Sequence, residues 1–239
     1  MLMAIAVLAG IRAAMAAGPL PLPGLGEGQR RLPVDPRSPP WPAVARLQIP
    51  GTARCTAVLL APRLAVTAAH CLYAPRLGGW VQAGAVHVLA GYAAGSFLRH
   101  ATALSYRIAP GFDPRDTAAT RGADLAVVTL AAAMPDTLAL AGDPPPGTPV
   151  LLGGYNQDRA EVIVADRHCA ITGRRADPGG RPLLLHDCAG TRGTSGGPLL
   201  VQAPDGTPLL AGLQVAARGD AAGGVAIPAA SIHRMLAQP

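Results

Sequence analysis

The chain has 239 residues, half of them hydrophobic but only 3% aromatic, and its formal net charge is +6. That length is enough for a substantial core and is common for all-β architectures that form a single domain. The positive charge comes entirely from arginines, which are scattered singly or in pairs without interleaved aromatic residues. We therefore expect no nucleic-acid binding.

Residues 1–17 are predicted to be a signal peptide. An apolar stretch from Leu2 to Ile11 leads into small residues that end in Ala14-Met15-Ala16, which suits cleavage near this point. The apolar run is too short to span a bilayer, so we expect no stable membrane insertion after cleavage. The four cysteines fit the oxidising compartment that export implies, and the sequence predicts a secreted or periplasmic protein.

Residues 18–42 are rich in Pro and Gly with little periodicity, which predicts an extended surface segment, either an arm or a propeptide. Beyond it, short apolar or alternating runs recur between turn signals, the pattern of a barrel or sandwich. We assign residues 43–133 to a first barrel. Its expected strands are Ala43–Ile49, Cys55–Leu60, Leu64–Ala68, Ala85–Ala90, Ala103–Ile108 and Leu125–Leu130.

Residues 134–149 contain three consecutive prolines, cannot pair inside a sheet and are interpreted as a linker. Residues 150–239 are assigned to a second barrel with a hairpin turn at Asp205-Gly206. The spacing of Ile232, Met235 and Leu236 predicts a short C-terminal helix. The second set of expected strands is Pro149–Tyr155, Ala160–Ala165, Leu183–Asp187, Pro198–Val201, Leu209–Ala216 and Gly224–Ile227.

Two motifs carry the chemistry. Thr67-Ala68-Ala69-His70-Cys71 follows an apolar strand, and Gly193-Thr194-Ser195-Gly196-Gly197-Pro198 precedes one. Amide hydrolysis by a serine requires a hydroxyl, a base, a group that fixes the tautomer of the base, and donors for the oxyanion. Glycines around Ser195 allow a tight turn on which the N–H groups of Gly193 and Ser195 converge. Alone, such a turn is most simply a loop; together with the histidine motif it favours a nucleophile.

The remaining histidines are interpreted as solvated or structural. His168-Cys169 and His186-Asp187-Cys188 together offer two nitrogens and two sulfurs, a set that zinc could use. In an exported chain a Cys169–Cys188 disulfide is favoured over that alternative, although four cysteines allow three pairings. We therefore expect no metal site.

The two motifs resemble the histidine and serine signatures of the chymotrypsin family of serine proteases, and they occur in the order found in that family. Asp124-Leu125-Ala126-Val127-Val128 is similar to the family's aspartate motif. Asp113 and Asp116 are competitors, but neither is followed by an apolar strand. The resemblance implies an all-β fold with two six-stranded antiparallel β-barrels and a short C-terminal helix.

The same resemblance implies the mechanism. Ser195 would attack the scissile carbonyl, His70 would act as base and then acid, Asp124 would orient the imidazole, and an acyl-enzyme would form without a cofactor. A Cys55–Cys71 disulfide, a pairing that the family also makes, would hold the strand beside His70. The substrate would be an extended polypeptide bound as an added strand, and we expect a monomer.

The sequence departs from the family at two positions. Activated digestive members have an aspartate at Thr194, which receives a newly cut N-terminus, and no activation sequence precedes Val44. We expect a site independent of such insertion, as in bacterial relatives that resemble glutamyl endopeptidases. Trypsin's pocket aspartate aligns with Ala189, so strict tryptic cleavage is not expected.

The substrate-binding strand is expected at Gln214-Val215-Ala216, where glutamyl-specific relatives tend to carry a histidine in place of Gln214. The pocket is thus predicted to be small and largely apolar. Two alternatives remain: an inactive protease-like binding module, and a quality-control protease with an attached peptide-binding domain. We do not expect the latter, because the chain ends just after the second barrel.

Overall fold

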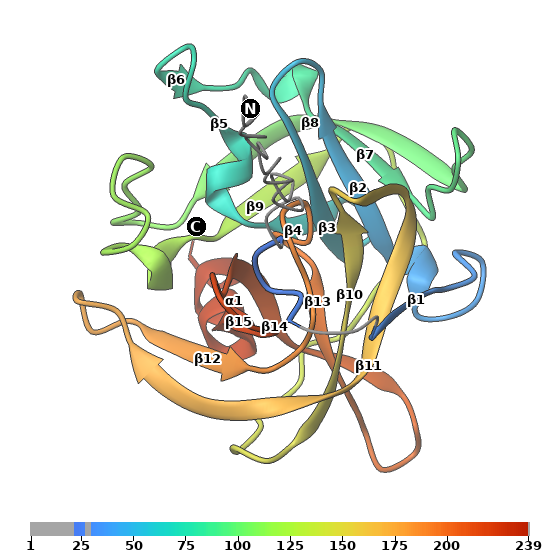
Figure 1. Ribbon diagram of the computed structural model, residues 1–239. Helices are drawn as coiled ribbons and strands as arrows, with labels where there is room; N and C mark the ends of the chain where they lie inside the picture. The colour runs from blue at the N-terminus through green and yellow to red at the C-terminus, as the bar shows by residue number, and fades with distance from the viewer. Residues whose placement is uncertain (1–21, 27–29, 239) are drawn as a thin grey trace, which may run out of the picture.

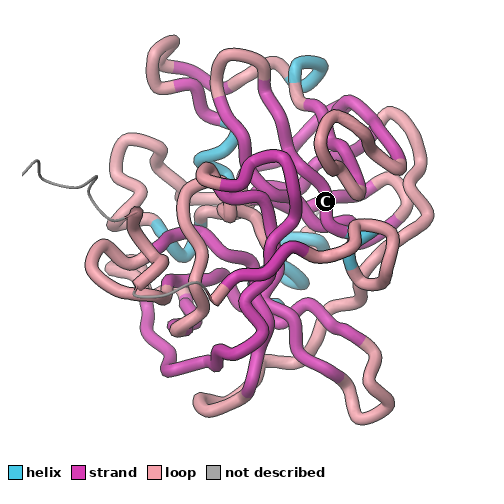
Figure 2. Tube along the Cα trace, turned by 45° about the vertical axis from the view of Figure 1, so that its right-hand side comes forward, coloured by secondary structure: helices cyan, strands magenta, loops and turns pink. Residues whose placement is uncertain are grey.

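A computed structural model describes residues 22–26 and 30–238, so the predicted signal peptide at 1–17 lies outside the described residues. The described chain folds into two strand-rich halves, seen one above the other in Figure 1 and as the magenta segments of Figure 2. Within those residues, no helix is both long enough and apolar enough to cross a membrane.

The first half is a closed barrel of six strands, in the order β2-β3-β4-β9-β8-β7, with every neighbouring pair antiparallel. Closure leaves no sheet edge open to another chain. The strands are β2 (Val44–Ile49), β3 (Ala53–Ala61), β4 (Leu64–Thr67), β7 (His87–Ala90), β8 (Arg99–Ile108) and β9 (Ala126–Leu130). A separate two-stranded ribbon consists of β5 (Tyr73–Ala74) and β6 (Gly79–Trp80).

The second half is a ring of six antiparallel strands, in the order β11-β10-β13-β14-β15-β12, which closes because β12 also pairs with β11. A seventh strand, β1, joins the outer edge of β11. The bounds are β1 (Arg31–Pro33), β10 (Pro149–Asn156), β11 (Arg159–Ala176), β12 (Pro182–His186), β13 (Pro198–Gln202), β14 (Pro208–Ala217) and β15 (Gly224–Pro228). The chain then enters helix α1 (Ala229–Leu236).

All twelve expected strands are present, and the predicted fold class is confirmed. The largest difference is β11, which continues to Ala176 rather than ending near Ala165, because its first part pairs with β10 and its last part with β12. In the part of the chain that the structure describes, four short 3-10 helices connect strands: η1 (Trp41–Ala43), η2 (Ala69–Leu72), η3 (Ala83–Ala85) and η4 (Arg121–Ala123).

The described part of the N-terminal segment contains the short strand β1 followed by turns and η1, and its β1 part packs on the second barrel. Arg31 is buried and makes a bidentate ion pair with Asp158, with contacts of 3.0 and 2.8 Å. The carbonyl of Gly24 accepts a hydrogen bond from Gly190 N–H at 3.0 Å. This segment therefore contacts the loop that leads to the predicted nucleophile.

Candidate active site

His70 and Asp124 are brought together by the pairing of β4 with β9. Thr67 at the end of β4 lies opposite Ala126 at the start of β9, so η2 and η4 leave the barrel at the same end. His70 Nδ1 lies 2.7 Å from Asp124 Oδ2, and the His70 backbone N–H donates to Asp124 Oδ1 at 2.9 Å. The two bonds fix both the ring and the backbone of His70 against one carboxylate.

The carboxylate controls the protonation of His70. Burial alone would lower the pKa of His70, but the charge and hydrogen bond of Asp124 more than offset burial and hold the pKa above its ordinary value. The Asp124 side chain is 3% exposed, whereas that of His70 is 32% exposed. The imidazole can therefore meet a substrate while its carboxylate partner is shielded from water.

Ser195 sits in the loop that leads into β13, and the glycines around it are required by close contacts. Gly193 and Gly196 have φ values of +90° and +80°, which favour glycine. A Cβ on Gly196 would collide with the Thr56 carbonyl and the Thr67 hydroxyl. The Ser195 side chain is partly exposed, and within the described part of the chain its hydroxyl makes no hydrogen bond with His70.

The N–H groups of this loop divide into two sets. Those of Thr194, Gly196 and Gly197 donate to the carbonyls of Thr191, Gln214 and Thr194 at 3.0, 2.7 and 2.7 Å. Those of Gly193 and Ser195 have no acceptor among the described residues. Two free donors beside a nucleophile are what an oxyanion hole requires.

Thr56 is a residue that sequence reasoning missed. Its N–H donates to the Ser195 carbonyl at 2.8 Å, and its hydroxyl donates to the Gly193 carbonyl at 2.9 Å. Its own carbonyl accepts the Thr67 hydroxyl at 2.8 Å, close to the histidine turn. Thr56 thus joins the serine loop of one barrel to the histidine end of the other. The only sequence signal was its position next to Cys55.

Asn156, at the end of β10, was also missed. Its Oδ1 accepts hydrogen bonds from the Thr194 hydroxyl at 2.8 Å and from the Thr191 N–H at 2.9 Å. Asn156 and Thr194 are both buried. Buried polar groups with satisfied partners specify one loop conformation. Asn156 therefore fixes Thr194, the residue before Ser195, through a hydrogen bond between two uncharged side chains.

Of the four predicted substrate-binding residues, two line the candidate cleft and two do not. Val215 and Ala216 line a cleft of about 320 Å³ together with His70 and Asp124. Ala189 is buried, and its N–H donates to Asp166 Oδ2 at 2.8 Å.

The side chain of Gln214 is buried and bonded. Its Oε1 lies 2.6 Å from His186 Nε2, and its Nε2 donates to the Ala216 carbonyl. Because Cys188 N–H donates to His186 Nδ1, the proton of this imidazole lies on Nε2.

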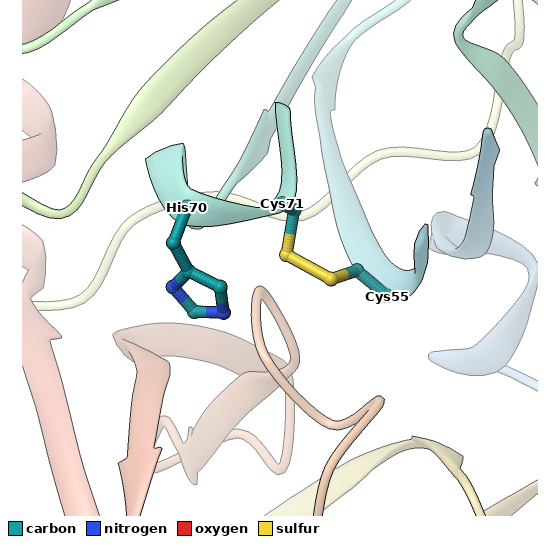
Figure 3. Close-up of side chains that lie close together, drawn as sticks. All are labelled: Cys55, His70 and Cys71. Atoms are coloured by element: carbon teal, nitrogen blue, oxygen red, sulfur yellow. A yellow bond between two sulfur atoms is a disulfide. The ribbon is translucent and has the colours of Figure 1, made fainter. Parts of the chain in front are cut away.

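Both expected disulfides are present, Cys55–Cys71 and Cys169–Cys188. Figure 3 shows His70 and Cys71 projecting from the same turn, with the bridge running to Cys55 on β3. Each pair lies within reach of a third possible metal ligand, His70 or Asp187, but the sulfurs are engaged in disulfides. They are therefore not available as thiolate ligands.

The competing aspartates lie elsewhere. Asp113 and Asp116 cap turns in the exposed loop before η4, where they accept backbone N–H groups of Arg115 and Ala119. Asp124 is the aspartate that contacts His70.

Comparison with known proteins agrees with this architecture. A family model described as Trypsin matches residues 34–236. A solved structure of a Glu endopeptidase in complex with MPD superposes with a TM-score of 0.71 at 19% identity, covering 90% of this chain and 100% of that one. A search of curated proteins gives no match.

Proposed function

The chain belongs to the trypsin family of serine-type endopeptidases, and from that premise we propose that His70, Asp124 and Ser195 are its catalytic triad. The proposal is supported by the double hydrogen bond between His70 and Asp124, at 2.9 and 2.7 Å. This is the arrangement that fixes the Nδ1–H tautomer and leaves Nε2 as the base.

In the proposed reaction the Ser195 hydroxyl attacks the scissile carbonyl as its proton passes to His70 Nε2. The carbonyl oxygen becomes an oxyanion, which receives the N–H groups of Gly193 and Ser195. The tetrahedral intermediate collapses when His70 protonates the leaving amine, and an acyl-enzyme remains. Water, deprotonated by His70, then releases the acid and restores Ser195. The unpaired N–H groups of Gly193 and Ser195 support this assignment.

The substrate is an extended polypeptide that adds a strand beside the Gln214–Ala216 part of β14. Ala189 supplies no carboxylate for an Arg or Lys side chain, so strict tryptic cleavage is not expected. The pocket residues are expected to favour small or apolar side chains before the cleaved bond. Profiling cleavage of a peptide library tests this, and a strict preference for Arg or Lys would refute it.

The active site is proposed to form without insertion of a new N-terminus. The uncharged bond between Thr194 and Asn156 supports this, because it occupies the position where an aspartate would receive an amine. If full activity arose only after cleavage near Val44, the proposal would be wrong.

We further propose that the protein acts as a monomer outside the cytoplasm, either secreted or in the periplasm. The two disulfides support an oxidising compartment. Cell fractionation with retention of both disulfides would test the location, and light scattering would test the monomer.

Covalent labelling tests the triad directly. A fluorophosphonate probe should label the full chain, and Ser195→Ala should abolish labelling and peptide hydrolysis while leaving the thermal midpoint of unfolding unchanged. A chain that folds but is neither labelled nor active would instead be a protease-like binding module.

A further inference from the structure

Asp177 is a buried carboxylate that the proposed mechanism does not use. It lies in the turn between β11 and β12, and its side chain has 0% exposure. Removing a carboxylate from water is strongly unfavourable unless hydrogen bonds or an ion pair compensate for the lost hydration. Its partners therefore indicate what it holds in place.

Three contacts satisfy the Asp177 carboxylate. Oδ1 accepts Arg181 N–H at 2.9 Å, and Oδ2 lies 3.6 Å from an Arg181 guanidinium nitrogen, so both of these close its own hairpin. The third contact reaches the other barrel, because Oδ2 accepts Gly122 N–H at 2.9 Å across a sequence separation of 55. In Figure 1 the tip of the β11–β12 hairpin approaches the yellow-green segment before β9.

Gly122 belongs to η4, the turn that presents Asp124. The turn is closed by a hydrogen bond from Asp124 N–H to the Arg121 carbonyl at 3.1 Å. A Cβ on Gly122 would collide with Arg181 and would lie 2.9 Å from Asp177 Oδ2. The hairpin and the turn are thus in direct contact, with room only for a glycine.

The carboxylate of Asp124 has little other support. Within residues 22–26 and 30–238, the hydrogen bonds that it accepts both come from His70. The second-barrel residues that line the cleft together with Asp124 are Val215 and Ala216, and neither has a side-chain donor. The position of Asp124 therefore depends on where the backbone of η4 is held.

We infer that Asp177 is a positioning residue for the triad: its hydrogen bond to Gly122 N–H anchors η4 to the second barrel and so sets the placement of Asp124 against His70. The inference rests on the proposed function, in which Asp124 orients His70. It also ties the two barrels together at the turn on which the triad depends.

A simpler role for Asp177 would be to cap its own hairpin. Asp205 does this in the β13–β14 hairpin, where Oδ1 accepts Thr207 N–H at 2.9 Å on an exposed turn. Among the described contacts Asp205 makes no bond to the other barrel. Asp205→Ala is therefore a matched control that removes a hairpin cap of the same barrel.

The test measures kcat, KM and the pH profile of peptide hydrolysis, normalised to the sites titrated by a fluorophosphonate. Asp177→Ala should lower kcat roughly tenfold or more, because a misplacement of about 1 Å can cost 100-fold. KM should change little. The acid limb of kcat should move to lower pH. The charge and hydrogen bond of Asp124 raise the pKa of His70, so a weaker contact between the two residues lowers that pKa.

Two further variants separate positioning from folding. Asp177→Asn keeps one oxygen, which can accept Gly122 N–H in place of the bond from Arg181 N–H, and should retain more of kcat than Asp177→Ala. Gly122→Ala should reproduce the defect of Asp177→Ala, because its methyl group pushes the hairpin away. In a Ser195→Ala background, the low-field proton signal of His70 Nδ1–H should shift in Gly122→Ala and not in Asp205→Ala. This measurement serves even if Asp177→Ala fails to fold.

The inference is overturned if kcat per titrated site, the pH profile and the His70 Nδ1–H signal all stay unchanged in the folded variants. A different failure would affect the proposed function instead: wild-type chain that is neither labelled nor active, although folded, would show that there is no triad to position.

Discussion

The Thr194 hydroxyl donates a hydrogen bond to Asn156 Oδ1 at 2.8 Å, and both residues are buried. The bond connects the end of β10 to the residue directly before Ser195. It is formed within the chain by two neutral side chains. The conformation of the serine loop should therefore change when either Thr194 or Asn156 is substituted, and it should not depend on ionic strength.

Replacing Thr194 by valine keeps the shape of the side chain and removes the donor. We expect Thr194→Val to lower the free energy of unfolding by about 1–2 kcal/mol, the cost of an unmade buried hydrogen bond. The kcat should fall because the N–H groups of Gly193 and Ser195 lose their alignment. Denaturant titration and steady-state kinetics measure both effects. Thr129→Val, on the exposed face of β9, is the control. Equal kcat in wild type and Thr194→Val would contradict the prediction.

The activity of Asp124→Asn should combine a large loss with a shifted pH profile. In this mechanism the substitution lowers kcat by about 10⁴-fold, since the imidazole takes the wrong tautomer. Burial then acts on His70 without the opposing carboxylate, so its pKa falls. Because the base must be neutral, the acid limb of the residual activity should move to lower pH. An acid limb at or above that of the wild type would argue against Asp124 as the partner of His70.

His186 should make the fold less stable in acid. Burial is the main cause that lowers its pKa from 6.5 to about 4. Between these values the unfolded chain binds a proton that the folded chain does not, so stability is full above about pH 6.5 and falls as the pH drops. The loss should reach about 3 kcal/mol near pH 4.

Urea titrations of wild type and His186→Gln measure this effect. The difference between the two proteins should depend on pH only below about 6.5, because the variant lacks the titrating group. Parallel curves for wild type and variant over the whole range would show that His186 does not supply the acid sensitivity.

Removing either disulfide should lower the free energy of unfolding by a similar amount, but the two removals should change different kinetic constants. Their sequence separations are similar, 16 and 19, so replacing either pair by serines should cost about 3 kcal/mol of unfolding free energy. Cys71 adjoins His70, so loss of the Cys55–Cys71 bridge should lower kcat. Loss of the Cys169–Cys188 bridge, next to Ala189, should mainly raise KM. Kinetics that are the same for both variants would contradict this division.

The sequence determined those features that are local. Alternating apolar runs located all twelve strands, because side chains in a strand point to opposite faces with period two. The glycines around Ser195 indicated a tight turn, and the structure gives two of them positive φ values. The ends of strands were less well predicted, as β11 illustrates, because they depend on which partners a strand finds.

Tertiary structure alone decided what supports the site. Thr56, Asn156 and Asp177 carry no motif, and each acts through a hydrogen bond to a residue that is distant in sequence. These partners meet only in the folded chain, those of Thr56 and Asp177 across the two barrels and that of Asn156 within the second barrel, and no local pattern encodes them. The sequence thus predicted the candidates for the chemistry, whereas tertiary packing determined how these groups are held, because buried donors and acceptors that are distant in sequence meet only in the folded chain.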